Sequence, residues 1–516
     1  MVNLFHSNLL MPPTSSVSDP VALINGNNSL TIADLLEKSK KLALGLKIKG
    51  FQENDIVLIT LPPSEEFLII IYAVAMLHGT VAIIDPEMGR KHFTAKLKQL
   101  TPKWAFVDSR LLFVREHRLI GFVLYKMGKI VPEIGDVQDC LIISTGPWVP
   151  TVRKYLRLKK MLREGEEVQF IHDNCDHEFL IIYTSGTIQE PKGVVHTFSS
   201  LTKSIRNLIK LIDKKPGDIL GTELPHYMLL GIAADIPVNI FSSGLSASAK
   251  IREIEQKKIT LLFGAPSEYL PLIQHCENAK RKLPSSLRKV FFGSAPVHAT
   301  FLKRFFLVAP IHIETMCLYG MTELLLCASI GGKDKLAMNR RHGDVLGKLL
   351  DDVACKIGED GEILLSSPQL FSRYFHEKGR DEFHASGDSG LLDERNNLIL
   401  TGRKKDMIIR KNFNIYPVIY ETIIRNIEGV DDCAIVGIWS DQKEDEEVCL
   451  VLEGRHLIPE RIRAHLSYGP NAIPKEVWPD VIVCMHIPRH GKHEKIDKKK
   501  LRVLLKKPQA FYEKRA

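Results

Sequence analysis

The chain has 516 residues and a formal net charge of +9, with 45% hydrophobic and 25% charged residues, which are values of a globular protein with two or more domains. Its nine cysteines occur singly, with no Cys-x-x-Cys pair, which argues against a disulfide framework or a zinc site and favours a reducing compartment. The N-terminus has no basic region followed by a long apolar core, so the sequence predicts no signal peptide and a cytoplasmic protein.

The first part of the chain alternates short apolar runs with amphipathic stretches. Strands are expected at residues 55–61, 81–84 and 104–107, and helices at residues 32–46, 67–77 and 91–99. The same pattern resumes around residues 261–264 and 290–293. This alternation predicts mostly parallel sheets wrapped by helices.

One apolar run, residues 67–84, is long enough to suggest a membrane span. His78 and Gly79 interrupt it, and β-branched residues follow up to Asp85-Pro86. The run therefore predicts a buried helix, a turn and a buried strand.

Two further stretches lie between the first strands and the loop described below. Residues 119–130 are apolar with two lysines, and residues 152–163 are basic at helical spacing. An amphipathic helix pair is the favoured interpretation, and an acyl-tunnel wall or peripheral contact with a membrane surface is the alternative.

The basic character of the chain is partly local. From residue 488 to the end, lysine and arginine greatly outnumber aspartate and glutamate. A solvated helix face is the favoured interpretation, and attraction of anions such as ATP or CoA is the alternative. Few aromatic residues are interleaved with the basic ones, which argues against nucleic-acid binding.

The pattern changes after residue 353. Short antiparallel strands are expected at residues 353–357, 361–365 and 397–400. A small α+β unit follows, with helices expected at 418–427 and 460–466 and strands at 432–438 and 448–453. The predicted domains are residues 1–402 and 403–516, with the boundary near Gly402 to Asp406.

The segment from Tyr183 to Gly193 combines hydroxyl side chains, glycines and one lysine directly after an expected strand. Such a loop offers backbone N–H groups, hydroxyls and an ammonium to a polyphosphate. It is not the usual P-loop, which requires Gly-x-x-x-x-Gly-Lys-Ser/Thr.

Five further motifs follow in order: Tyr319-Gly320-Met321-Thr322-Glu323, Ser386-Gly387-Asp388, Gly402-Arg403-Lys404-Lys405-Asp406, Asn414-Ile415-Tyr416-Pro417 and Lys495-Ile496-Asp497. With the loop, they make the chain resemble the adenylate-forming superfamily of acyl-CoA synthetases, peptide-synthetase adenylation domains and luciferases, over about residues 20–503. The expected fold is α/β: a large N-terminal domain of helix-wrapped, mostly parallel sheets with a small antiparallel β subdomain, and a small mobile C-terminal α+β domain.

The resemblance implies a set of residues around ATP. The leaving pyrophosphate would be held by Thr184, Ser185, Gly186, Thr187 and Lys192. The adenine would stack on Tyr319 and approach the turn formed by Gly293, Ser294 and Ala295.

The resemblance also implies the catalytic groups. Thr322 would contact the α-phosphate, and Glu323 would hold Mg²⁺ as a hard oxygen ligand. Asp388 and Arg403 would bind the ribose, and Lys405 would be the hinge of the small domain. Lys495 would supply the catalytic cation between the carboxylate and the α-phosphate.

The chain departs from the family pattern at a few positions. Ile188 and Gln189 replace a hydroxyl residue and a glycine of the loop, Glu494 replaces the glycine before Lys495, and Asn412 stands in a segment that usually carries a glycine pair. Met228 occupies a position that is commonly His in acyl-CoA synthetases. The segments around Met228, residues 85–89 and residues 263–266 look like the branch of β-lactone synthetases.

The leading hypothesis is ATP- and Mg²⁺-dependent activation of a fatty acid to acyl-AMP, followed by transfer to CoA or an acyl carrier protein. One alternative is a β-lactone synthetase that closes a β-hydroxy acid. The other is a nucleotide-binding protein that has lost turnover through its departures from the pattern.

Overall fold

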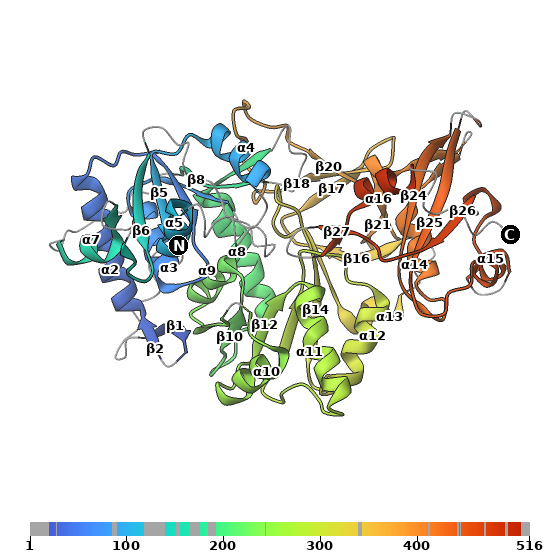
Figure 1. Ribbon diagram of the computed structural model, residues 1–516, viewed down its shortest axis with the longest axis horizontal. Coiled ribbons are helices and arrows are strands. Elements are labelled where there is room, and N and C mark those ends of the chain that lie inside the picture. Colours follow the sequence, from blue (N-terminus) through green and yellow to red (C-terminus); the bar gives the residue numbers. More distant parts are fainter. Residues whose placement is uncertain are drawn as a thin grey trace.

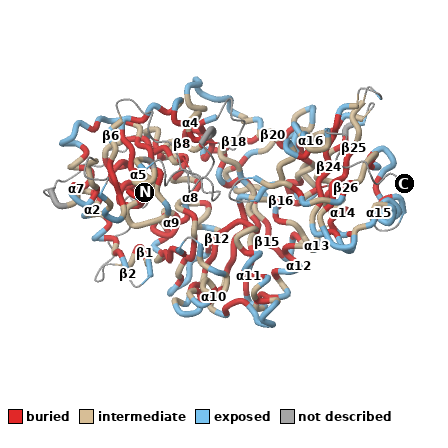
Figure 2. Tube along the Cα trace, in the orientation of Figure 1, coloured by how far each residue is buried: buried red, intermediate tan, exposed pale blue. Residues whose placement is uncertain are grey.

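The structure is a computed structural model, which describes residues 20–26, 28–84, 90–117, 140–150, 155–164, 176–183, 192–242, 244–338, 343–410, 413–440, 443, 445–468, 471–490 and 494–506. Figure 1 shows a broad body, coloured blue through yellow along the chain, joined to a smaller orange and red C-terminal part. Figure 2 shows buried positions concentrated along the sheets and exposed positions on outer helices such as α10 and α15.

The first sheet comprises eight strands of the described chain, in the order β19-β9-β8-β4-β3-β5-β6-β7. From β8 to β7 the neighbouring strands are parallel, whereas β9 and β19 are antiparallel to their neighbours. The bounds are β3 Ile56–Thr60, β4 Thr80–Ile83, β5 Trp104–Asp108, β6 Leu141–Thr145, β7 Leu156–Arg157, β8 Glu178–Tyr183, β9 Gly193–Thr197 and β19 Arg373–Tyr374.

The second sheet has thirteen strands within the described ranges, in the order β17-β18-β20-β21-β16-β15-β14-β13-β12-β10-β11-β1-β2. Strands β1 and β10–β14 form its parallel part. The neighbouring strands in the remaining order β14-β15-β16-β21-β20-β18-β17 are antiparallel to one another. The bounds are β1 Val21–Asn25, β2 Asn28–Thr31, β10 Leu220–Thr222, β11 Val238–Ile240, β12 Leu261–Gly264, β13 Lys289–Phe292, β14 Glu314–Tyr319, β15 Ala328–Gly331, β16 Asp344–Leu349, β17 Ala354–Ile357, β18 Glu362–Ser366, β20 His384–Leu392 and β21 Asn397–Arg403.

Helices cover these sheets, and several begin at a residue whose side-chain oxygen accepts a hydrogen bond from the first turn, as in α2, α3, α8 and α10. Helix α3 is buried at every position from Phe67 to Met76, because it lies in the largest core cluster. The bounds are α2 Ile32–Ile48, α3 Glu65–Met76, α4 Arg90–Leu100, α5 Ser109–Glu116, α7 Leu158–Glu164, α8 Phe198–Ile212, α9 Pro225–Ala233, α10 Ala247–Gln256, α11 Pro266–Asn278, α12 Ala299–Val308 and α13 Gly332–Ala337.

The C-terminal part carries its own apolar clusters on the two faces of a three-stranded sheet, one of them centred on Ile435 and the other including Leu501 of α16. The bounds are η3 Lys404–Asp406, β22 Ile408–Arg410, β23 Phe413–Ile415, α14 Pro417–Ile424, β24 Val430–Ser440, β25 Asp445–Gly454, α15 Pro459–Ser467, η4 Lys475–Val477, β26 Val481–Cys484, β27 Arg489–His490, β28 Lys495–Ile496 and α16 Lys498–Leu505.

The expected α/β architecture is confirmed, and residues 67–84 form α3, a turn and β4 as predicted. None of the helices in the described ranges is both long and apolar enough to cross a bilayer. The antiparallel strands expected after residue 353 are present, but they continue the second sheet. Residues 119–130 lie outside the described residues. The helix expected at 152–163 was wrong in extent, because residues 156–157 add a strand to the first sheet and α7 begins only at Leu158.

Candidate functional site

The carboxylate of Asp388 is the centre of a buried polar cluster in the second sheet. Tyr319, the last residue of β14, donates its hydroxyl to Asp388 Oδ2 at 2.7 Å. Arg403 faces Asp388 in the β20–β21 ladder and places Nε 2.6 Å from Oδ1. Asp388 is only 2% exposed, and Oδ1 has the ion-pair contact with Arg403 but accepts no hydrogen bond from the described residues. This oxygen of a buried carboxylate, although paired with Arg403, can therefore still accept a hydrogen bond from a ligand.

Lys495 comes to the same cluster from the C-terminal part of the chain. It lies on β28, which pairs with β27 in a short hairpin. Burial and the charge of Arg403 lower the pKa of the Lys495 ammonium, whereas Asp388 raises it. Burial raises the pKa of the Asp388 carboxyl, and the charges of Arg403, Lys405 and Lys495 oppose this shift. The structure thus brings together Tyr319, Asp388, Arg403 and Lys495.

Glu494, which stands where the family pattern has a glycine, keeps a glycine-like backbone. Its φ is +53°, in the left-handed region, where a residue with a Cβ costs about 1 kcal/mol more than glycine. The substitution therefore preserves the turn that presents Lys495 and leaves it strained.

Thr322 and Glu323 follow Tyr319 in a tight turn. A Cβ at Gly320 would lie 2.1 Å from the carbonyl oxygen of Leu325, so this turn requires glycine. His196 Nε2 donates to the Thr322 carbonyl at 2.7 Å. Burial lowers the pKa of His196, which favours the neutral ring. Glu323 Oε1 accepts a hydrogen bond from the Tyr374 hydroxyl at 2.9 Å, so the turn and its carboxylate are both held in place.

The turn formed by Gly293, Ser294 and Ala295 follows β13, which pairs in parallel with β14. The carboxyl ends of the two strands are neighbours, so this turn lies beside Tyr319. Ser294 has a φ of +63°, and its side chain hydrogen-bonds the hydroxyl of Tyr227. A Cβ at Gly293 would meet only ordinary contacts, so space within the protein does not explain this glycine.

The expected phosphate loop follows β8, and Thr184, Ser185, Gly186 and Thr187 lie outside the described residues, as do Ile188, Gln189 and Asn412. Lys192 is described, is exposed, and places Nζ 4.7 Å from the centre of the Tyr374 ring. The loop lysine and the Glu323 carboxylate therefore contact the same tyrosine.

Apolar residues of the segments around Met228 and residues 263–266 are packed in the core. Met228 on α9 is fully buried, and Tyr227 packs against Phe263, with ring centres 4.6 Å apart. Phe263 stacks on Phe291 at 4.0 Å. These side chains form an aromatic wall next to the Gly293 turn.

The geometry can be compared with known proteins. The sequence model of a family described as AMP-binding enzyme matches residues 15–375. The chain belongs to the AMP-binding enzyme family. The match covers more than half of the chain and includes Tyr319, Thr322 and Glu323.

Individual members of the family are distant in sequence. A feruloyl-CoA synthase from Amycolatopsis is 29% identical, over 81% of this chain and 82% of its own. A long-chain-fatty-acid–CoA ligase from Mycobacterium tuberculosis is 24% identical, over 84% and 85%. The solved structure of an O-succinylbenzoate coenzyme A synthetase from Bacillus subtilis, in complex with ATP and magnesium ion, has a TM-score of 0.74 and 18% identity, with 96% of this chain and 99% of that chain covered.

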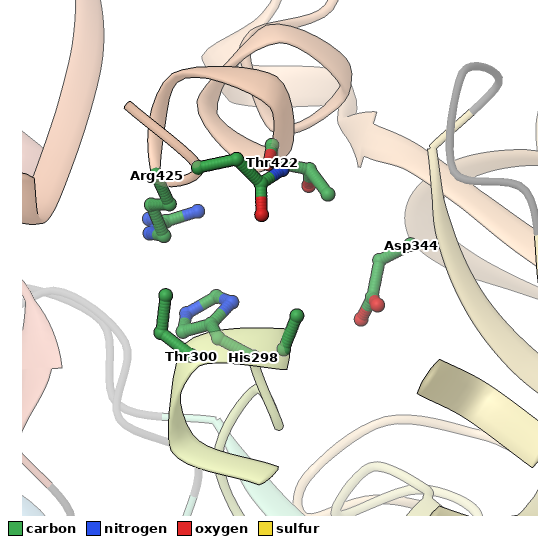
Figure 3. A pocket seen from close by; sticks show the side chains of 7 residues that line it. His298, Thr300, Asp344, Thr422 and Arg425 are labelled. Atoms are coloured by element: carbon green, nitrogen blue, oxygen red, sulfur yellow. Dashed lines mark hydrogen bonds between the residues drawn. The ribbon is translucent and has the colours of Figure 1, made fainter. Parts of the chain in front are cut away.

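A small pocket lies where α12 meets α14 of the C-terminal part, and Figure 3 shows its lining. His298 and Thr300 come from the start of α12, Asp344 from β16, and Thr422 and Arg425 from the end of α14. Arg425 is itself held by Asp432, with Nε 2.8 Å from Oδ1. Charged and titratable side chains from both parts therefore line this pocket.

Burial and the nearby charge of Arg425 lower the pKa of His298 to about 3. Lys335 lowers this pKa further, whereas the carboxylates of Asp432 and Asp344 raise it. The neutral ring is thus favoured wherever α12 and α14 are in contact. Because this pKa lies below that of an exposed histidine, the folded form binds fewer protons. The contribution of the neutral His298 ring to the stability of the folded protein is fully present above about pH 6.5 and is lost as the pH falls toward 3.

We expect the His298→Asn variant to lose less stability than the unchanged protein on going from pH 7.5 to pH 5.0. The difference should be on the order of 1–2 kcal/mol, since each pKa unit corresponds to about 1.4 kcal/mol. Urea denaturation of both proteins at both pH values measures this difference in the free energy of unfolding. Identical pH dependence in the two proteins would exclude this role of His298.

Sequence reasoning missed His196, Tyr374 and His298. His196 lies three residues after Gly193, the last residue of the loop motif, so its position near a motif was the available signal. Tyr374 and His298 act through partners far away in sequence, and no spacing pattern indicated either residue.

Proposed function

We propose that this protein activates a carboxylic acid with ATP, releases pyrophosphate, and transfers the acyl group from acyl-AMP to the thiol of CoA or an acyl carrier protein. The observation that carries the proposal is the buried carboxylate of Asp388, whose Oδ1 is paired with Arg403 but accepts no hydrogen bond from the described residues, and which interacts electrostatically with Lys495. A buried carboxylate with an open acceptor and a mobile cation suits a bound nucleotide.

The adenosine half of ATP fits this cluster. Because Tyr319 already occupies Oδ2 of Asp388, a ribose hydroxyl would donate to Oδ1. Arg403 is half exposed and can donate to the second ribose oxygen. The Tyr319 ring would stack on the adenine, with the turn at Gly293, Ser294 and Ala295 on its other side.

The phosphates would extend toward the turn after Tyr319. Lys192 and the loop residues Thr184, Ser185, Gly186 and Thr187 would bind the leaving pyrophosphate, and Thr322 the α-phosphate. The described residues hold no group of three His, Cys, Asp or Glu side chains that could bind a metal on its own. Mg²⁺ commonly binds through one or two carboxylates and the substrate phosphates, so Glu323 fits that role. When bound, Mg²⁺ would offset the charge of the pyrophosphate.

The first reaction joins two anions, since a carboxylate oxygen attacks the α-phosphorus as the bond to pyrophosphate breaks. The Lys495 ammonium would lie between the carboxylate and the α-phosphate and neutralise both. A compact charge on a flexible stem suits this position. The same lysine must leave before a thiol can reach the acyl-AMP.

We propose that residues 403–516 move as one domain relative to residues 1–402, with Lys405 as the hinge. Lys405 is exposed on η3, directly after β21, and its neighbour Lys404 is tied to Asp360 and Glu362. A turn about this point would carry Lys495 away from Asp388 and bring another face of the C-terminal part to the acyl-AMP.

The proposed acid is a fatty acid, which the name of the mycobacterial relative supports. Other relatives act on aromatic acids by their names, such as the feruloyl-CoA synthase. No structural observation favours lactone closure or loss of turnover, and these alternatives differ from the proposal in their products.

A panel of fatty, aromatic and β-hydroxy acids, assayed for pyrophosphate release with and without CoA, tests the proposal. Release with a fatty acid alone, followed by consumption of CoA, is the expected result. AMP formed only from β-hydroxy acids and independent of CoA would indicate the lactone synthetase. ATP binding without pyrophosphate from any acid would contradict an activating enzyme.

A further inference from the structure

Tyr374 lies on an edge strand that is held by backbone hydrogen bonds to one neighbour, β9. Strand β19 pairs with β9, with Tyr374 opposite Val194, two residues after Lys192. The backbone N–H groups of Ser372 and Phe375 donate to carbonyls of β9, each at 2.7 Å. Next to Tyr374, the Arg373 guanidinium binds both oxygens of Glu178, at 2.5 and 2.7 Å. The position of the Tyr374 ring is therefore set by the first sheet.

The side chain of Tyr374 contacts two charged groups of opposite sign. Its hydroxyl donates to Glu323 Oε1 at 2.9 Å, and the Lys192 ammonium lies 4.7 Å from its ring centre. The Phe371 ring packs against it at 4.7 Å, and the Phe371 N–H donates to the Glu323 carbonyl at 2.9 Å. Burial and then the Glu323 charge raise the pKa of Tyr374, so its hydroxyl keeps its proton and remains a donor.

We propose that Tyr374 is a positioning residue for the metal-bound pyrophosphate, holding the Glu323 carboxylate and the Lys192 ammonium at a fixed separation. This inference rests on the proposed role of Glu323 as the Mg²⁺ ligand. The hydroxyl donates to Oε1, so Oε2, which accepts no hydrogen bond from the described part of the chain, would be the oxygen available to hold the metal. A hydrogen bond to a ligating carboxylate fixes its orientation and commonly changes metal affinity by tenfold or more.

The ring has a second, separable effect. A cation over the face of an aromatic ring is attracted to it, which restricts the long lysine side chain before the phosphates arrive. The hydroxyl therefore acts on the metal and the ring acts on the lysine, so substitutions can separate the two effects.

Tyr374→Phe and Tyr374→Leu provide the test, with Tyr155→Phe as the matched control. Tyr155 also donates to a glutamate, Oε1 of Glu116, at 2.9 Å, in another part of the first domain. Calorimetric titration of each protein with ATP, in Mg²⁺ and again in EDTA, gives dissociation constants that do not depend on turnover. The Mg²⁺ dependence of pyrophosphate release is the second readout.

We expect Tyr374→Phe to weaken MgATP binding about tenfold and to leave metal-free ATP binding within about twofold, with the rate restored by excess Mg²⁺. Tyr374→Leu should weaken metal-free ATP binding as well, because it also removes the ring. Tyr155→Phe should match the unchanged protein. The proposal would be overturned if Tyr374→Phe weakened the binding of ATP equally with and without Mg²⁺. It would also be overturned if Tyr374→Phe, like Tyr155→Phe, bound MgATP as tightly as the unchanged protein.

The binding experiment distinguishes failure of the Tyr374 inference from failure of the proposed function. If the unchanged protein binds MgATP but releases no pyrophosphate from any acid, the function fails, and the binding constants still decide the role of Tyr374. If MgATP binds no more tightly than metal-free ATP, the metal role of Glu323 fails and the inference on Tyr374 fails with it.

Discussion

Lys495→Ala is expected to slow acyl-AMP formation by several orders of magnitude while leaving thioester formation from preformed acyl-AMP largely intact. The Lys495 ammonium interacts electrostatically with Asp388 and Arg403, next to which the carboxylate and the α-phosphate would meet in the proposed reaction. Loss of one fixed charge-stabilising group in such a site commonly costs a factor of about 10²–10³, and two anions repel each other when the cation is removed.

The two half-reactions are measured separately. Pyrophosphate release reports the first, and thioester formed from synthetic acyl-AMP and CoA reports the second. Lys499→Ala, which removes an exposed lysine of α16, is the matched control and should leave both rates unchanged. Equal loss of both steps in Lys495→Ala would refute the role assigned to this side chain.

Asp388→Asn is expected to raise the dissociation constant of ATP by about a hundredfold and to abolish discrimination between ATP and its 2′- and 3′-deoxy analogues. The Oδ1 atom of the buried carboxylate is paired with Arg403 but accepts no hydrogen bond from the described residues, and hydrogen bonds to a charged group contribute about 1.5–3 kcal/mol each. The amide keeps the shape of the side chain but removes the charge and one acceptor.

The deoxy analogues make this prediction specific. In the unchanged protein they should bind more weakly than ATP, and in Asp388→Asn all three nucleotides should bind alike. Tyr319→Phe is the companion variant, because it keeps the ring and frees Oδ2. If Asp388→Asn still prefers ATP over its deoxy analogues by the original ratio, Asp388 does not bind the ribose.

Much of the fold could be predicted from periodicity. The apolar run of residues 67–84 divides into α3 and β4 because His78 has a φ of +52° and a Cβ at Gly79 would lie 2.6 Å from the Phe51 ring, so the chain must turn there. Joining of the antiparallel strands to the second sheet was not predictable, since no local pattern encodes which strand edges meet.

The same distinction applies to the site. Tyr319 and Asp388 were predicted from short motifs, and the structure places them in direct contact. Tyr374 was not predicted, because its contact with Glu323 joins residues that are 51 positions apart and depends on the pairing of β19 with β9. Motifs indicate the residues that would touch the ligand, whereas the side chains that orient them emerge only from tertiary packing.

The two sheets carry different ends of the expected nucleotide: Tyr319 and Asp388 belong to one, Lys192 and Tyr374 border the other. A ligand long enough to contact both sheets at once would stabilise their relative position. Adenosine and pyrophosphate added together should therefore raise the melting temperature less than intact ATP does. In the proposed arrangement, the bond between the α-phosphate and the pyrophosphate would lie between the two sheets.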